Sequence, residues 1–477
     1  MNCTPLMPRG ALLLGLLAAC GTAPPATPPA ELAVDMPTAW DSATAAGESA
    51  PLQQDWWLAF GDPQLDAFMA QALTHNRDLG ASIARLEAFA AARTIAGAPL
   101  WPEVDAGLNA QRARRLFLGF PFGGGGVPSS TVTTYGLTVN VRWEIDVWGR
   151  LRAAESAAIA DQQVALADFH GARLSLLGQI CRGWFAAIEA RQQLTLAEAT
   201  VAAFRSTGDD VRDRFRRGVR PAVDVHLAAT NLANAEANVA QRRDALQRTL
   251  RHLDVLAGRY PDGRTSTGAA LPRALPQVPA GLPSDLLQRR PDLIAAERRV
   301  AATGCRIEAA RAALYPSLSL TGGGGTSTLD LQDLVDKNFR TWSLGANLLE
   351  PIFRGGALRA EVARRQALRQ EALQNYGGTV LRAFAEVEDV LTSDARLAER
   401  REHLAAAAHH ATAARDLARQ RYQAGIVDFL AVADGQRQAF QAESALIGID
   451  RARLENRIDL FLALGGGYAP TTNGDGQ

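Results

Sequence analysis

The chain has 477 residues, with 50 basic and 50 acidic side chains, 47% hydrophobic residues and a mean hydropathy of -0.08. This composition excludes disorder as the main state, and the neutral balance of charge gives no electrostatic reason to bind nucleic acid. Lys337 is the sole lysine and follows no glycine loop, which excludes a Walker A motif. Cys3, Cys20, Cys181 and Cys305 form no C-x-x-C pair and have no histidine spacing for zinc, so no metal or cofactor is expected.

The first 19 residues have the pattern of an export signal, with Arg9 followed by an apolar core and small residues. The run Leu17-Ala18-Ala19-Cys20 resembles a bacterial lipobox, whose cysteine is acylated and becomes the mature N-terminus. Cys20 is therefore the expected lipidation site, and Gly21 after it favours the outer membrane. An ordinary signal peptide cut nearby is the alternative. Residues 20–50 are rich in Pro, Ala and Thr and are expected to form an acylated flexible tether.

An internal duplication organises the rest of the chain. Residues 76–79 match residues 290–293 at an offset of 214, and the Leu-Trp-Pro run at 100–102 matches Leu-Tyr-Pro at 314–316 at the same offset. Further on, residues 214–219 match residues 421–426 at an offset of 207. We therefore expect a first structural repeat over 51–265, a second over 266–465 and a tail over 466–477.

Each repeat has the same predicted order of elements. The first contains a helix over 64–96, strands over 104–117 and 135–146, and a long helix over 149–216, after which a glycine turn leads into another helix. The second contains the equivalent elements, predicted over 283–313, 317–328, 340–349 and 356–423. Beyond the leader no apolar run approaches the roughly 20 residues of a spanning helix, whereas membrane strands leave a weaker trace.

The predicted strands alternate apolar and polar residues, as in residues 135–146. Such alternation fits membrane strands with aromatic girdles at Trp101, Trp143, Tyr315 and Trp342. It fits a soluble sandwich as well, so periodicity alone leaves both open.

The helices supply a second constraint. At about 1.5 Å per residue, a helix of about 67 residues extends roughly 100 Å, which no compact globule accommodates easily. Their apolar residues have coiled-coil spacing. Four strands are too few for a closed membrane barrel, which needs about 8, and an open edge cannot face lipid. If the strands span a membrane, several chains must pool them.

Four segments carry a resemblance to a known family. Residues 281–293 read GLPSDLLQRRPDL and residues 310–320 read ARAALYPSLSL, while WEIDVWGR at 143–150 and PIFRGG at 351–356 look like strand-to-helix junctions. Together they closely resemble outer-membrane efflux lipoproteins, the TolC-like ducts and especially their OprM-type branch. The resemblance runs in order from about residue 55 to residue 465.

This resemblance implies an α+β membrane protein: a trimeric 12-stranded β-barrel, with four strands per chain, continuing into a long periplasmic α-helical barrel. The implied function is the outer-membrane exit duct of a tripartite resistance-nodulation-division (RND) pump, conducting small molecules passively. The implied partners are two further copies of the chain, a periplasmic adaptor, an inner-membrane RND transporter and outer-membrane lipid. No catalytic residue is expected, because no enzyme motif appears.

The resemblance also implies a closed periplasmic end at the turns over 214–224 and 421–434. Asp434 matches a carboxylate ring at the constriction, Leu430 an apolar ring one turn earlier, and Asp224 a residue that bonds across to the neighbouring helix in some members. Gly218 and Gly425 suit a helix C-terminus, and Asp428 can cap the next helix. The alternative is that Asp434 and Asp224 only complement helix dipoles.

The turns also depart from the family pattern. Some relatives have an acidic residue in place of Ala431 and an arginine in place of Val427. Arg220, in the other turn, is the candidate to replace that arginine.

Other features have simpler interpretations. The glycine runs 123–126 and 322–325 are interpreted as loop or barrel-bend residues near strand ends, and the adjacent His409 and His410 as helix residues that point different ways. The competing function is a periplasmic structural or adaptor coiled-coil lipoprotein. Duplication of the whole hairpin and strand pair argues against it.

Overall fold

The computed structural model describes residues 37, 39–41, 53–117, 129–278 and 283–467. Its residues group into two compact units. One contains residues 86–165 and 296–375, and the other contains residues 31–85, 166–295 and 376–477, as far as they are described. Both sequence repeats contribute to each unit, so the units do not correspond to the repeats, and the predicted repeat boundaries stay predictions.

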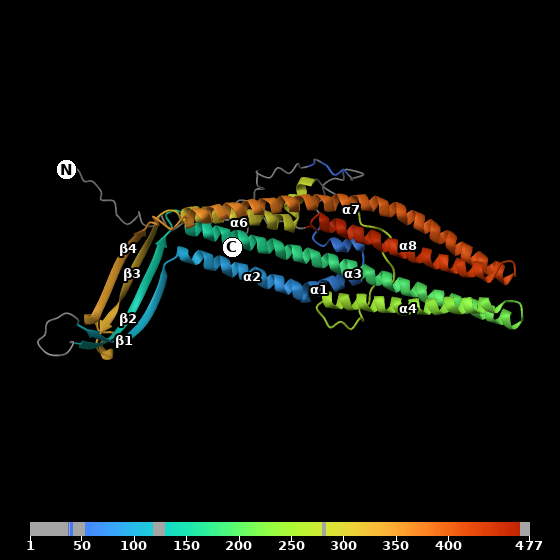
Figure 1. The fold of residues 1–477 in the computed structure, drawn as a ribbon, viewed down its shortest axis with the longest axis horizontal. Coiled ribbons are helices and arrows are strands. Elements are labelled where there is room, and N and C mark those ends of the chain that lie inside the picture. Colours follow the sequence, from blue (N-terminus) through green and yellow to red (C-terminus); the bar gives the residue numbers. More distant parts are fainter. Residues whose placement is uncertain (1–36, 38, 42–52, 118–128, 279–282, 468–477) are drawn as a thin grey trace, which may run out of the picture. The chain divides into compact units, whose positions relative to one another are not determined.

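The first unit contains a four-stranded antiparallel sheet in the order β1-β2-β3-β4 (Figure 1). The strands are β1 Glu103–Leu116, β2 Ser129–Ile145, β3 Ser317–Thr328 and β4 Arg340–Leu349. The boundaries predicted for β3 and β4 are confirmed, whereas β2 begins six residues before the predicted 135. The prediction began too late because the segment before residue 135 contains polar residues such as Ser130 and Thr133 and alternates less clearly. In the structure this segment pairs with β1, which extends β2 through it.

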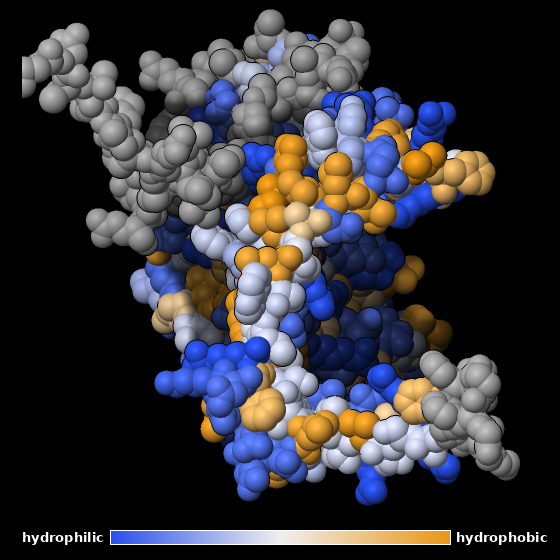
Figure 2. Space-filling view, turned by 90° about the vertical axis from the view of Figure 1, so that its left-hand side faces the viewer, coloured by the Kyte–Doolittle hydropathy of each residue, from blue (hydrophilic) through white to orange (hydrophobic). Residues whose placement is uncertain are grey.

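One face of this sheet carries the apolar residues. Val104 and Leu108 of β1 pair with Val141 and Leu137 of β2, so their side chains lie on the same face. Large apolar side chains on this face are exposed: Val104, Leu108, Leu137, Val139, Val141, Leu320, Trp342, Leu344 and Leu348. In Figure 2, hydrophobic residues lie on the visible surface among hydrophilic ones. A sandwich sheet would cover such a face with a second sheet, and none covers it here among the described residues.

The glycines at 322–325 exclude one of the two sequence interpretations. They lie inside β3, opposite residues 138–141 of β2, and not in a loop near its end, whereas a bend within the strand stays a prediction. Strand pairing explains the difference, because both neighbours of β3 are antiparallel strands whose ladders run through the glycines. The run at 123–126 lies outside the described residues.

Two helical hairpins repeat each other in length. The hairpin of the first repeat has α3 Arg150–Arg216 and α4 Ala222–Leu256, of 67 and 35 residues. The hairpin of the second has α7 Ala357–Gln423 and α8 Phe429–Ala463, also of 67 and 35 residues. The long helices predicted from the sequence are confirmed. In the described part of the chain, no helix combines the length and apolar character needed to cross a membrane.

Shorter helices precede each strand pair. They are α1 Pro63–His75, α2 Arg77–Gly97, α5 Leu286–Arg289 and α6 Pro291–Ala312, with short 3-10 helices at Trp56–Phe60, Ala98–Leu100 and Pro283–Asp285. Two more 3-10 helices, Leu331–Asp333 and Lys337–Phe339, lie between β3 and β4. The prediction of one continuous helix over 64–96 is wrong, because Asn76 ends α1 and caps α2. Its Oδ1 accepts from the Leu79 N–H at 2.9 Å, and its Nδ2 donates to the Leu256 carbonyl at 2.9 Å.

The matching helix over 283–313 is also interrupted. Arg290 takes an extended conformation because a residue before proline, here Pro291, is driven out of the helical region. Its buried guanidinium donates to Asp292, Glu386 and the Ala463 carbonyl, all at 2.7–3.1 Å. The Arg-Pro-Asp run thus ties the start of α6 to α7 and to the end of α8.

The second unit contains the hydrophobic core. Trp184 of α3 is 1% exposed, and its indole N–H donates to Asp62, the N-cap of α1, at 2.8 Å. Trp56 stacks on Phe461 of α8 with ring centroids 4.9 Å apart. Burying aromatic side chains of this size stabilises a fold by about 1.5–3 kcal/mol each. The core therefore fixes the bases of both hairpins.

Candidate functional site

The two hairpin turns have the same backbone geometry. Gly218 and Gly425 have φ values of 72° and 78°, in the left-handed region that favours glycine. The N–H of Val219 donates to the Arg214 carbonyl at 2.9 Å, and the N–H of Ile426 donates to the Arg421 carbonyl at 2.9 Å. These are Schellman caps, which close the C-termini of α3 and α7 and reverse the chain.

The helices after the turns begin differently. Asp428 is the N-cap of α8, and its Oδ1 accepts from the Ala431 N–H at 3.0 Å, which confirms the predicted cap. Pro221 occupies the N-cap of α4, and Asp224 lies in the first turn of that helix. Asp224 is thus placed where its charge complements the helix dipole.

Two arginines of the first hairpin bind the second hairpin. Arg214 donates to the carbonyls of Tyr422 and Gln423, each at 3.1 Å, at the C-terminus of α7. Arg220 donates to the Val427 carbonyl at 3.1 Å. The Tyr422 and Gln423 carbonyls carry the partial negative charge of a helix C-terminus, which favours a guanidinium.

Both guanidinium groups also pack on Tyr422. Their Cζ atoms lie 4.6 Å (Arg214) and 5.2 Å (Arg220) from the centre of the Tyr422 ring, within cation–π distance. Tyr422 is 2% exposed and packs edge-on against Phe429, with ring centroids 6.4 Å apart. Burial raises the pKa of the Tyr422 hydroxyl, against the opposing effect of the two arginines. The phenol is therefore neutral at physiological pH.

A small apolar cluster surrounds this aromatic residue. Its buried members come from all four helices of the two hairpins: Val211, Ala228, Tyr422, Phe429 and Val432. The two turns are consequently joined by apolar packing as well as by the arginine bonds. We use the name tip latch for the three residues Arg214, Arg220 and Tyr422, which make the polar and cation–π contacts between the two hairpins.

Leu430 and Asp434 lie four residues apart on α8, so they share one helix face. Leu430 is 65% exposed although it is apolar, whereas its neighbours Phe429 and Val432 are buried. Asp434 is half-buried, forms an ion pair with Arg437 and accepts from Gln438 at 2.6 Å. The face thus combines an exposed apolar side chain with a carboxylate that already has partners.

The sequence indicated a role for one of the two arginines. Arg220 was predicted as a substitute for the missing arginine, and the structure does give it a bond at the Val427 position. The bonds of Arg214 were missed, because a basic residue in the last turn of a helix is common without any partner. Spacing alone gave no indication that this side chain reaches the other hairpin.

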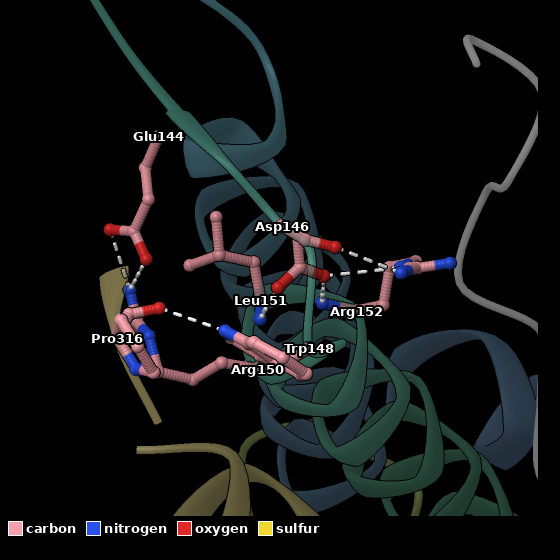
Figure 3. A network of polar contacts seen from close by, with 7 residues as sticks. All are labelled: Glu144, Asp146, Trp148, Arg150, Leu151, Arg152 and Pro316. Atoms are coloured by element: carbon pink, nitrogen blue, oxygen red, sulfur yellow. Dashed lines mark hydrogen bonds and ion pairs between the residues drawn. The ribbon is translucent and has the colours of Figure 1, made fainter. Parts of the chain in front are cut away.

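A second polar network lies in the first unit, where β2 becomes α3 (Figure 3). Asp146 accepts from the N–H groups of Leu151 and Arg152 at 3.0 and 2.9 Å, and from the Arg152 guanidinium at 3.1 Å. Burial alone would raise the pKa of this carboxyl, but these bonds outweigh it and lower the pKa. Asp146 is therefore ionised and caps α3 at neutral pH.

Aromatic side chains complete this junction. The Trp148 indole donates to the Pro316 carbonyl at 2.8 Å and stacks on Tyr315, with ring centroids 4.9 Å apart (Figure 3). Arg150 donates to both carboxylate oxygens of Glu144 at 2.7 and 2.8 Å. A cavity of about 310 Å³ lies beside these residues. The junction thus ties the end of β2 to the start of α3 and to the residues that precede β3.

The other predicted site residue, Cys20, lies outside the described residues. Among the described residues, no group of three or more His, Cys, Asp or Glu side chains is arranged to hold a metal ion. His409 and His410 lie next to each other on α7 with ring centroids 5.4 Å apart.

Comparison with known proteins decides the family. The sequence model of the family described as outer membrane efflux protein matches residues 68–259 and 282–466. The chain belongs to the outer membrane efflux protein family. It is 31% identical to the pyoverdine export outer membrane protein OpmQ of Pseudomonas putida, over 97% of this chain and 98% of that protein.

Solved structures agree with this membership. The outer-membrane channel OprN is similar with a TM-score of 0.84 and 26% identity, over 94% of this chain and 99% of that one. The open state of the MtrE outer membrane channel of Neisseria gonorrhoeae gives a TM-score of 0.80 and 26% identity, over 94% and 98%. The predicted fold class and function are confirmed: this efflux protein has the fold of the family's trimeric channels and is an outer-membrane exit duct of an RND-type system.

Proposed function

We propose that three copies of this chain form a lipid-anchored duct that performs no reaction and opens at the hairpin turns. In this proposal Cys20 is the acylated N-terminus, residues 20–50 are the tether, and the repeats over 51–265 and 266–465 each supply one strand pair and one hairpin. A periplasmic adaptor and an inner-membrane RND transporter deliver the cargo. Support comes from family membership and from the open edges of the four-stranded sheet.

The proposed constriction consists of Leu430 and Asp434, with Asp224 and the turn glycines Gly218 and Gly425 around it. One observation carries this assignment: Leu430 is exposed at the start of α8, whereas Phe429 and Val432 pack inward. An exposed leucine followed one turn later by a carboxylate can form an apolar ring and a charged ring when three copies surround an axis. Such rings exclude water and favour cations over anions.

A mass measurement tests the assembly. The mature protein, released from outer membranes in detergent, is expected to give a native mass spectrum of a trimer whose subunits begin at acylated Cys20. Fully unfolded subunits should carry the mass of the lipid. A Cys20→Ser variant that keeps the leader should lack that mass, which controls for tightly bound free lipid. Monomers without acylation would refute the trimer and the anchor together.

A conductance measurement tests the constriction. The Leu430→Ala/Asp434→Ala variant is expected to raise single-channel conductance in planar bilayers roughly twofold or more, because an apolar ring and a charged ring both narrow the path. Asp434→Asn alone should reduce the preference for cations without a comparable rise in conductance.

The matched control for this pair is Asp416→Ala/Leu417→Ala on α7, which also removes one carboxylate and one exposed leucine. Its conductance should equal that of the parent. Equal conductance for the α8 and α7 variants would remove Leu430 and Asp434 from the constriction.

A further inference from the structure

The apolar face of the sheet changes character along β2. The side chains of β2 on this face are apolar or aromatic from Ile145 back to Tyr135, and they carry hydroxyl groups from Thr133 back to Ser129. Ten positions separate Tyr135 from Ile145. At about 3.3 Å per residue on a strand tilted by roughly 40°, this segment rises about 25 Å, the height of the apolar band of a membrane barrel. The band therefore ends just beyond Tyr135.

The helices join these strands at the other end. Helix α2 ends at Gly97, before β1, and α3 begins at Arg150, after β2 (Figure 1). Because the outer-membrane channels of this family extend their long helices into the periplasm, the end of the β1–β2 hairpin that is far from the helices lies at the outer leaflet. The inference below rests on the proposed trimer in the outer membrane and concerns the lipid around it.

Charge differs between the two faces of the sheet. All acidic residues of the four strands lie on the face opposite the apolar one: Glu103, Asp105 and Glu144. The apolar face has arginines and no acidic residue within the strands: Arg112, Arg114 and Arg340. Arg112 pairs with Thr133, and Arg114 pairs with Thr131. The two arginines of β1 consequently lie just beyond the apolar band, at the level of lipid headgroups.

These two arginines are not neutralised by the chain. Both are exposed, and they lie about 7 Å apart along one face. Arg114 donates to the Ser129 hydroxyl at 3.0 Å, whereas the guanidinium of Arg112 has no partner among the described residues. The sequence has no acidic residue over 106–141, and within the described part of the chain neither arginine forms an ion pair with the aspartates over 330–336. Two neighbouring guanidinium groups repel each other, so an anion between them lowers the electrostatic free energy.

We propose that Arg112 and Arg114 bind the phosphate of a glycolipid in the outer leaflet. Guanidinium groups bind phosphate through paired N–H donors, and the hydroxyls of Thr131 and Thr133 lie opposite them to bond the remaining oxygens. Basic residues beside an apolar membrane surface are typical of recognition of anionic lipids.

The apolar band selects a lipid over a free phosphate ion. Directly next to the two arginines, the same face continues with Ala110 and Tyr135 and then with Leu108 and Leu137. Leu108 and Leu137 are exposed. One lipid molecule therefore satisfies both parts of the face, its phosphate at the arginines and its acyl chains along the apolar residues, whereas a phosphate ion satisfies only the first.

A lipid titration tests the site. The native trimer in detergent is titrated with lipid A that carries two phosphates and, separately, with lipid A from which both phosphates have been removed. Native mass spectrometry counts the bound lipids and confirms the trimer in the same spectrum. The parent should bind the phosphorylated lipid roughly tenfold more tightly than the dephosphorylated one. Arg112→Gln/Arg114→Gln should bind the two lipids alike.

The matched control is Arg115→Gln/Arg142→Gln, which removes two exposed arginines from the opposite face of the same two strands. Its preference for the phosphorylated lipid should equal that of the parent, and an equal loss of preference in this control would overturn the proposal. The comparison of the two lipids on the parent needs no substitution, so poor folding of a variant cannot decide the result. A parent trimer that binds both lipids alike refutes the lipid site alone, whereas a native monomer refutes the proposed function.

Discussion

Replacing Arg214 and Arg220 together with alanine is expected to open the hairpin tips and raise the mean conductance of the channel. The two guanidinium groups donate to three carbonyls of the second hairpin and lie over the buried Tyr422 ring. A cation–π contact contributes about 0.5–2 kcal/mol, and a hydrogen bond to a charged group about 1.5–3 kcal/mol. Since the guanidinium groups are partly exposed, we expect a combined effect on the order of 3 kcal/mol.

An effect of that size shifts a closed–open equilibrium by roughly a hundredfold. Planar-bilayer recordings should show long closed periods in the parent and a dominant open level in the double variant. Each single variant should lie between the two, because the two arginines bind different carbonyls.

The control removes two arginines that stay within their own helix. Arg212 and Arg216 form ion pairs with Asp209 and Asp213, each three residues away on α3. Arg212→Ala/Arg216→Ala therefore removes the same charge from the same region without touching the second hairpin. If this control opens the channel as much as Arg214→Ala/Arg220→Ala does, then the total positive charge near the turns, and not the contacts of the tip latch, keeps the tips closed.

Lysine replacement separates charge from geometry. An ammonium group has no planar fork, so Arg214→Lys cannot reach two carbonyls and cover the ring as the guanidinium does. We expect Arg214→Lys to restore only part of the closed state. Full restoration would indicate that positive charge alone is sufficient.

Long-range regularity made much of the fold predictable. Four strands and two pairs of long helices followed from alternation, coiled-coil spacing and duplication, and β3 and β4 have the predicted boundaries. Interruptions within the predicted helices were harder to predict. Asn76 interrupts a helical pattern through a bond to the Leu256 carbonyl, 180 positions away, which no local signal encodes. Only the Pro291 break had a local cause that the sequence displayed.

At the candidate site the sequence predicted the two hairpin turns, but it did not predict the contacts between the two hairpins. Glycine at 218 and 425 and aspartate at 428 are local signals, and the structure has the Schellman and N-cap bonds that such residues favour. The contact of Arg214 with Tyr422 depends on how two hairpins distant in sequence pack. Its prediction would have required knowing that Tyr422 is buried between them.

Substituting one glycine of β3 is expected to have the largest effect in the sheet. A Cβ at Gly325 would lie 1.9 Å from the Leu137 carbonyl oxygen and 2.9 Å from the Thr138 Cα, both atoms of the paired β2 backbone. Backbone atoms held in a ladder cannot rotate away as a side chain does, so Gly325→Ala must separate the two strands locally. Because β2–β3 is the joint between the repeats, its loss disconnects the two strand pairs.

The neighbouring glycine supplies a matched control. A Cβ at Gly324 meets no atom within 4 Å, so Gly324→Ala adds the same methyl group one residue away without a clash. We expect Gly324→Ala to yield trimers at the parental level and Gly325→Ala to yield at least tenfold fewer, a loss equivalent to about 1.4 kcal/mol or more. The measurement is the amount of native trimer extracted from outer membranes, relative to total protein. Equal yields from the two variants would show that β2 and β3 can separate at this point without cost, and the joint between the repeats would then have to be held elsewhere.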